Sequence, residues 1–173
     1  MQIIESNKNF NADDMHLGLM LYGYYCYHDS VLKNIVPNNI QWKHKPSEFG
    51  PYGVAICDSA SKILKETQLH KYKEYYPNIQ VIRSITYYNI DNGVGVWHTD
   101  KREKLTIQAM CYQTDFGVTD GGSLQIKCYD GIERHYYPKN GDVVLMNHVT
   151  ETTHKIDKIL TDKKRVVINM IMR

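Results

Sequence analysis

The C-terminal half of the sequence alternates apolar and polar residues in short runs, which is the pattern of half-buried β-strands. In the first run, apolar residues fill one face at Leu105, Ile107, Ala109 and Cys111. The next run shows the same pattern at Leu124, Ile126 and Cys128. Successive side chains of a strand point to opposite faces, so each of these strands is expected to bury one face. The segments 143–146 and 166–172 are more continuously apolar, as expected for strands enclosed between a second sheet and covering helices.

Short turn sequences separate these runs. Four of them combine Asp or Asn with Gly: Asp91-Asn92-Gly93, Asp120-Gly121-Gly122, Asp130-Gly131 and Asn140-Gly141. Such sequences favour tight turns, so the chain from Gln80 onward is predicted to form hairpins with roughly seven or eight strands. A mainly β jelly roll of the cupin type, a double-stranded β-helix, is the economical arrangement. It protects the sheet edges and leaves one open end where side chains can converge.

The N-terminal part of the sequence carries a helical pattern instead. This pattern is clearest from Gly53 to Tyr76, and Pro77 then supplies a stop. The residues that recur at helical spacing are Ile56, Ala60, Ile63, Leu64 and Thr67. We therefore expect residues 1–77 to be mostly helical and to cover a jelly-roll core built from residues 78–173. A length of 173 residues is usual for one domain, so a single domain over 1–173 is predicted.

Composition narrows the function classes. The chain has 21 Lys and Arg against 19 Asp and Glu, a formal charge of +2, so it lacks the basic excess of a dedicated nucleic-acid-binding protein. The four cysteines include no CxxC pair and are interpreted as reduced core thiols. The apolar stretch 15–27 is broken by His16 and two glycines and has no basic flank. Neither a signal peptide nor a membrane span is predicted, and a cytoplasmic location is the expectation.

A candidate metal site begins at His98 and Asp100. In an extended segment, positions i and i+2 point to the same side, so the imidazole and the carboxylate can reach a common point. Such a triplet also arises by chance, and two polar residues in a loop are the alternative interpretation. A second imidazole is available farther along the chain at His154. Two imidazoles and one carboxylate form a facial triad that leaves three positions of iron open, whereas zinc usually prefers a closed tetrahedron or three ligands and a water.

Arg165 opens the last apolar run and requires an explanation. A buried guanidinium without a partner is costly, and a carboxylate bound by two hydrogen bonds is its best match. No acid within that run supplies one, which predicts an acidic co-substrate. An Arg that extends its head to solvent at a strand entrance is the alternative. His148 could replace His154 as the distal ligand, but its place just after a strand favours the rim of the site. The other histidines, at positions 16, 28, 44, 70 and 135, show no partnered spacing.

The order His98, Asp100, His154 and Arg165 resembles the iron(II)- and 2-oxoglutarate-dependent dioxygenases, particularly their prolyl-hydroxylase-like branch. The resemblance covers residues 78–173. It implies that the first three of these side chains bind iron and that the arginine anchors 2-oxoglutarate. Two turns also resemble turns of the family: Gly121-Gly122-Ser123-Leu124 and Pro138-Lys139-Asn140-Gly141-Asp142.

The same resemblance assigns four further residues to the co-substrate site. Tyr88 stands ten residues before the first metal-binding histidine and would face 2-oxoglutarate. Tyr112 would donate its hydroxyl to the distal carboxylate beside Arg165. Met110 and Leu124 would form the apolar walls of the site.

One departure from the family is Val167, because many relatives place a serine or threonine two residues after the arginine as a second carboxylate donor. Tyr112 is the expected substitute. The implied reaction decarboxylates 2-oxoglutarate oxidatively with dioxygen, releases succinate and carbon dioxide, and hydroxylates a C–H bond. The implied cofactors are Fe(II), 2-oxoglutarate as co-substrate, and dioxygen.

The primary substrate carries no motif in this sequence. A peptidyl side chain of prolyl type, in a peptide or protein, is the first choice. Trp97, Arg83 and the charged run 101–104 are candidate entrance residues, with a solvated loop beside one core aromatic as the alternative. A nucleobase-oxidising enzyme of the AlkB type is a second reading if the tyrosine-rich segments 22–27 and 72–76 stack on bases. A catalytically silent, metal-binding cupin-like module is a third interpretation of the function. No membrane partner is expected.

Overall fold

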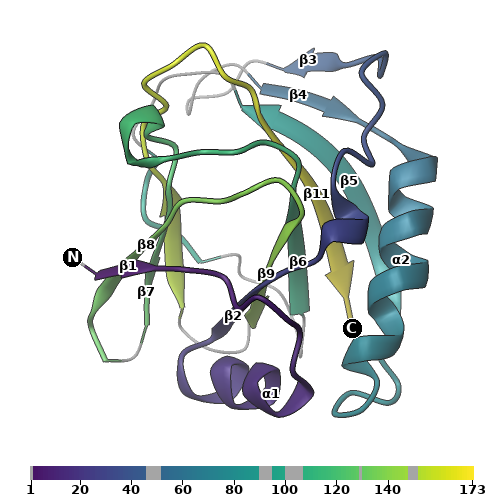
Figure 1. The fold of residues 1–173 in the computed structure, drawn as a ribbon, viewed down its shortest axis with the longest axis vertical. Coiled ribbons are helices and arrows are strands. Elements are labelled where there is room, and N and C mark those ends of the chain that lie inside the picture. Colours follow the sequence, from purple (N-terminus) through teal and green to yellow (C-terminus); the bar gives the residue numbers. More distant parts are fainter. Residues whose placement is uncertain (1, 46–51, 90–94, 100–106, 129, 148–151) are drawn as a thin grey trace.

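Two β-sheets face each other in the molecule (Figure 1). The structure is a computed structural model that describes residues 2–45, 52–89, 95–99, 107–128, 130–147 and 152–173. Within these residues, the smaller sheet has the strand order β1 (Gln2–Ile4), β8 (Glu133–Tyr136), β7 (Leu124–Lys127) and β10 (Thr153–Ile156). The larger sheet has the order β2 (Tyr24–His28), β9 (Asp142–Asn147), β6 (Ile107–Tyr112), β11 (Arg165–Met172), β5 (Val81–Asn89), β4 (Tyr52–Ala55) and β3 (Lys43–Lys45).

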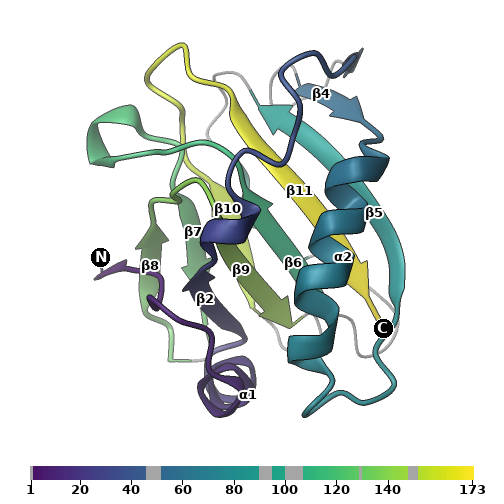
Figure 2. The same ribbon diagram turned by 45° about the vertical axis from the view of Figure 1, so that its right-hand side comes forward.

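Two α-helices pack on the face of the larger sheet that points away from the smaller one, which we call the outer face (Figure 2). They are α1 (Ala12–Leu21) and α2 (Asp58–Tyr72). The structure also contains two short 3₁₀ helices, η1 (Ser30–Leu32) and η2 (Val118–Asp120). The side chain of Asn11 caps α1 by accepting a hydrogen bond from the backbone N–H of Asp14 at 2.9 Å. On α2, Ala60 and Leu64 are completely buried, so the apolar stripe of this helix is what holds it on the sheet.

The alternation of side chains along β11 shows how one sheet serves two hydrophobic clusters. Ile168 and Met170 belong to the outer cluster, which also contains the buried faces of the helices. Val167 belongs to the inner cluster, which fills the space between the two sheets. The inner cluster also includes Met110 of β6 and Leu124 of β7. Because the period of a strand is two, odd-numbered residues of β11 face inward and even-numbered residues face the helices.

The strands predicted from hydrophobic patterns are confirmed, and so is the mainly β architecture with helices on one sheet. The two alternating runs correspond to β6 and β7, and the two continuously apolar runs correspond to β9 and β11. The expectation of a single buried face is wrong for β6, because Gln108, Met110 and Tyr112 on its second face are buried as well. Strands β9 and β11 are central strands of the seven-stranded sheet, covered by helices on one face and by the smaller sheet on the other. This double burial explains why their sequences do not alternate.

The expectation that residues 1–77 are mostly helical is wrong. Only α1 and α2 are α-helical in the described part of this region, and four strands, β1 to β4, extend the two sheets. The helix expected from Gly53 begins at Asp58, because 52–55 form β4 and pair with β5. Gly53 lies directly opposite Tyr88, and a Cβ atom at Gly53 would lie 2.1 Å from the tyrosine ring. Glycine is therefore required there by the close approach of an aromatic ring.

The four cysteines are all buried and form no disulfide, as expected of reduced core thiols. Burial raises the pKa of the Cys111 thiol to about 12 and that of Cys128 to about 11. Both thiols are therefore protonated near neutral pH and are poor metal ligands. In the described residues, no helix is long and apolar enough to cross a membrane.

Candidate metal and co-substrate site

His98 and His154 lie side by side although 55 residues separate them in the chain. The segment 95–99 runs antiparallel to β10, and the two histidines form a bridge through two backbone hydrogen bonds. The N–H of His98 donates to the carbonyl of His154 at 3.1 Å, and the reverse bond measures 2.9 Å. The centroids of the two imidazole rings are 4.4 Å apart. Directly paired residues point to the same face, so the fold presents both imidazoles to one point.

A hydrogen bond to the backbone fixes the orientation of the His98 ring. Its Nδ1 lies 2.8 Å from the carbonyl oxygen of Val96, and a carbonyl oxygen can only accept. The neutral ring therefore carries its proton on Nδ1 and its lone pair on Nε2. This arrangement is typical of histidines that bind metal ions, because a hydrogen bond to the second nitrogen orients the ring and selects the tautomer.

The third predicted ligand, Asp100, lies outside the described residues, and so does the alternative distal histidine, His148. Among the residues that the structure describes, no group of three His, Cys, Asp or Glu side chains could hold a metal ion. The structure therefore brings together the two predicted imidazoles, and the carboxylate stays a prediction. The charged run 101–104 also falls outside the described residues.

Arg165 is completely enclosed: only 1% of its surface is exposed. It is the first residue of β11, and its Nη2 donates a hydrogen bond to the hydroxyl of Tyr112 on the neighbouring strand at 2.8 Å. The guanidinium carbon also lies 4.9 Å from the centre of the Tyr112 ring. Among the described residues, neither Nε nor Nη1 of Arg165 has a hydrogen-bond partner. A buried cation with unsatisfied donors is costly, so this pair of donors indicates an anionic ligand with at least two acceptor oxygens.

Tyr112 is suited to act beside Arg165 as a neutral donor. Burial raises the pKa of the Tyr112 phenol well above its ordinary value, although the charge of Arg165 opposes this shift. The hydroxyl therefore keeps its proton near neutral pH. In this structure the proton points toward the thioether of Met110, with 4.0 Å between oxygen and sulfur, which is a weak acceptor. A carboxylate that arrives next to Arg165 would offer a much stronger one.

His154 and Arg165 face the same interior from opposite sheets, whereas His98 is exposed beside its bridge partner His154. His154 is paired with Ile126 of the inner cluster, so its side chain points between the sheets and is only 6% exposed. Arg165 is two residues before Val167, also in the inner cluster, and shares its face of β11. The apolar walls predicted at Met110 and Leu124 lie in this same cluster.

Tyr88 does not lie with these residues, contrary to expectation. It pairs with Val166 on β11 and with Gly53 on β4, which places it on the outer face of the larger sheet. Its hydroxyl is hydrogen bonded to Nδ1 of His44 at 2.7 Å, and its ring packs edge-on against Trp42. The neighbouring Tyr87 is the one that packs against the inner cluster. The pleat of β5 places Tyr87 on the inner face and Tyr88 on the outer face.

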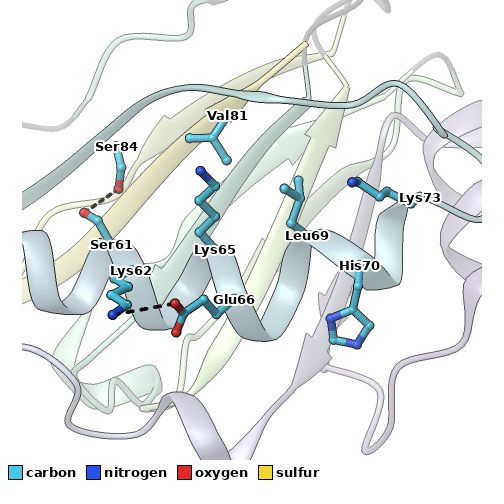
Figure 3. Close-up of a pocket in the computed structure, with 9 residues that line it drawn as sticks. All are labelled: Ser61, Lys62, Lys65, Glu66, Leu69, His70, Lys73, Val81 and Ser84. Atoms are coloured by element: carbon cyan, nitrogen blue, oxygen red, sulfur yellow. Dashed lines mark hydrogen bonds and ion pairs between the residues drawn. The ribbon is translucent and has the colours of Figure 1, made fainter.

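A groove between α2 and β5 is one alternative site in the described part of the chain (Figure 3). Lys62, Lys65 and Lys73 line it, and Ser61 of the helix is hydrogen bonded to Ser84 of the strand at 2.8 Å. It lies on the outer face, away from both histidines. Its lysines are exposed, and the serine hydroxyls and His70 beside them form no metal-binding group in the described residues. This groove is therefore not the candidate site.

No protein-family model matches the sequence, and no curated protein sequence matches it. The structure, in contrast, is similar to solved oxygenases. One is an oxidoreductase of the 2OG-Fe(II) oxygenase family from Burkholderia pseudomallei, with a TM-score of 0.71 and 8% identity, over 98% of this chain and 94% of that one. Another is HygX from Streptomyces hygroscopicus with nickel, 2-oxoglutarate and hygromycin B bound, with a TM-score of 0.69 and 10% identity, over 94% and 87%.

A third is a prolyl hydroxylase from Trichoplax adhaerens in complex with a peptide fragment of the oxygen degradation domain of hypoxia inducible factor. Its TM-score is 0.69 at 12% identity, over 93% of this chain and 88% of that one. These identities are too low to establish a shared activity, but nearly the whole chain is superposed in each case. The chain has the jelly-roll fold of the 2OG-Fe(II) oxygenases.

Proposed function

We propose that this protein is an Fe(II)- and 2-oxoglutarate-dependent dioxygenase that hydroxylates a C–H bond. The observation that carries the proposal is the buried guanidinium of Arg165, hydrogen bonded to Tyr112 and facing the same interior as His154, the bridge partner of His98. In the reaction, one atom of dioxygen enters the substrate C–H bond as a hydroxyl. The other enters 2-oxoglutarate, which becomes succinate as its carboxylate leaves as carbon dioxide.

The side chains of His98, Asp100 and His154 would hold the iron. The donor set fits, because two imidazoles and one carboxylate leave adjacent positions open for a chelating co-substrate and for dioxygen. The bond from Nδ1 of His98 to the Val96 carbonyl supports this role. When bound, the metal supplies the activation of dioxygen that no side chain can provide.

The remaining residues would bind and orient 2-oxoglutarate. Nε and Nη1 of Arg165 would donate to its distal carboxylate, and the Tyr112 hydroxyl would turn from Met110 to the same group. Val167, where many relatives carry a second hydroxyl donor, can contribute only an apolar contact. The apolar walls, including Leu124, would exclude water and thereby strengthen the pairing between guanidinium and carboxylate.

A peptidyl side chain of prolyl type remains the proposed substrate. The similarity to a peptide-bound prolyl hydroxylase supports it, whereas the hygromycin B bound to HygX illustrates that the fold also binds small molecules. The AlkB-type alternative loses its support, because the tyrosines invoked for base stacking are mostly packed in the protein. Tyr25, Tyr27 and Tyr72 are all buried in the outer cluster.

The proposed activity is tested by incubating the protein in air with Fe(II), 2-oxoglutarate and proline-containing peptides. Succinate formation coupled to a peptide mass gain of one oxygen atom is expected, and both should disappear in Asp100→Ala. Formation of succinate without oxidation of the peptide would support the oxygenase activity and exclude these peptides as substrates. A folded protein that binds metal but never forms succinate would support the silent cupin-like module instead.

A further inference from the structure

The inner face of β5 forms a strip beside the candidate site. Val81 and Ser84 point toward α2 (Figure 3), so they belong to the outer face. Arg83, Ile85 and Tyr87 lie on the other face, since they pair with inward-facing residues of β11. Figure 2 shows these two strands running side by side along the sheet. We call Arg83, Ile85, Tyr87 and Asn169 of β11 the inner strip.

Exposure increases across the inner face from the centre of the sheet toward this strip. Met110 and Val167 are buried, whereas Asn169, Ile85 and Tyr87 are only partly buried. Arg83, at the far end, is exposed. The strip is therefore accessible to a molecule from solvent, and Val54 of β4, which pairs with Tyr87 and is partly buried, continues this accessible surface.

Asn169 supplies an unsatisfied acceptor in this strip. It lies between Ile85 of β5 and Met110 of β6 in the register of the sheet. Its Oδ1 is buried and has no hydrogen-bond partner among the described residues. A buried amide oxygen in this state is costly, and a backbone N–H from a bound chain would satisfy it.

Arg83 supplies a positive charge at the outer end of the strip. Within the described part of the chain, it forms no ion pair with a carboxylate. It lies four positions before Tyr87, so the two Cα atoms are about 13 Å apart along the strand. A ligand that reaches from Tyr87 to Arg83 must be extended, which suits a peptide better than a compact small molecule.

We propose that the substrate is a peptide with an acidic residue, held along the inner strip. This inference rests on the proposed function and specifies its substrate. A backbone N–H of the peptide donates to Oδ1 of Asn169, and the carboxylate of an Asp or Glu pairs with Arg83. The reactive residue then lies at the Tyr87 end of the strip, which is the end nearer Arg165.

Two fluorescently labelled peptides test the proposal. Each contains one proline, flanked by glutamates in one peptide and by lysines in the other. Their affinities are measured by anisotropy with the Fe(II)- and 2-oxoglutarate-loaded protein under anaerobic conditions. The acidic peptide is expected to bind about tenfold more tightly, and Arg83→Glu should reverse this preference, because like charges repel as strongly as opposite charges attract.

Asn169→Leu should weaken both peptides about equally, since it removes a contact to the backbone rather than to a side chain. Lys65→Glu, which makes the same charge change on the outer face, is the matched control and should leave the preference intact. Equal binding of the two peptides, no binding of either, or no effect of Arg83→Glu would overturn the inference. The Fe(II)–2-oxoglutarate absorption band, recorded on the same samples, separates these results from failure of the proposed function, in which the band itself is absent.

Discussion

The two faces of the larger sheet differ in whether their buried polar groups have hydrogen-bond partners. On the outer face, the hydroxyl of Tyr27 is hydrogen bonded to Gln68 and to Tyr72, each at 2.6 Å. Thr86 is an exception there, because its hydroxyl has no partner among the described residues. On the inner face, a complete guanidinium is buried at Arg165 with two nitrogen atoms unsatisfied. The outer face thus resembles a structural core, whereas the inner face has buried polar groups, at Arg165 and Asn169, without a partner among the described residues.

This comparison predicts that inner-face substitutions change activity more than stability, and outer-face substitutions the reverse. The largest expected effect is that of His154→Ala on the inner face. Loss of one imidazole ligand should abolish iron binding and lower succinate formation about a thousandfold, equivalent to ~4 kcal/mol in activation free energy. Metal content and succinate yield measure this effect. His70→Ala, at an exposed histidine on α2, is the control, and an equal loss in that variant would refute the assignment.

Leu64→Ala tests the outer face. Leu64 is completely buried between α2 and the sheet, so its truncation leaves a cavity and should lower the free energy of unfolding by about 3 kcal/mol. Chemical denaturation measures this change. The KM for 2-oxoglutarate should stay the same at temperatures where the variant is folded. A raised KM in folded Leu64→Ala would mean that the two faces are not independent.

Arg165→Met has opposite effects on binding and on stability. The methionine keeps most of the volume but removes the donors, so the KM for 2-oxoglutarate should rise about a hundredfold, or ~2.7 kcal/mol. The thermal unfolding midpoint of the protein without ligands should stay the same or rise, because an unsatisfied buried charge has been removed. Lys164→Met changes the adjacent exposed charge and should alter neither quantity. A strongly lowered midpoint in Arg165→Met would indicate a structural role for the guanidinium.

The smallest effect comes from a pair of tyrosine hydroxyls. Tyr112→Phe should raise the KM for 2-oxoglutarate about tenfold, or ~1.4 kcal/mol, because it removes one hydrogen bond to a charged group. Tyr88→Phe removes the bond to His44 on the outer face and should leave this KM unchanged. Steady-state kinetics of the two variants compare the faces directly. If Tyr88→Phe had the larger effect, the placement of the co-substrate on the inner face would be wrong.

The hydrophobic pattern of the sequence predicted four of the strands, β6, β7, β9 and β11. The alternation was sufficient for β6 and β7, and the continuous apolar runs were sufficient for β9 and β11, which are covered on both faces. The short strands β1 and β3 have only three residues each, too few for any period. Strand β4 directly precedes α2, and its sequence merges with the helical pattern. Pairing with β5, which lies far along the chain, decides its conformation.

The site was predicted in part by the types and order of its residues. His98 and His154 are brought together, and Arg165 is buried beside Tyr112, as the order of motifs indicated. Asp100 lies outside the described residues and stays a prediction. Tyr88 was misplaced because a fixed interval in sequence does not determine which face of a strand a residue occupies. The alternation that places Tyr87 and Asn169 inward depends on the register between β5 and β11, which no local pattern specifies.

The most direct test of the central claim is an anaerobic titration of the protein with Fe(II) and 2-oxoglutarate. The weak visible charge-transfer band of the chelated pair should appear at saturation. It should be lost in Asp100→Ala and require far more 2-oxoglutarate in Arg165→Met, and admission of oxygen should yield succinate. A folded, iron-containing protein that shows neither band nor succinate would contradict the assignment of the inner face as an oxygenase site.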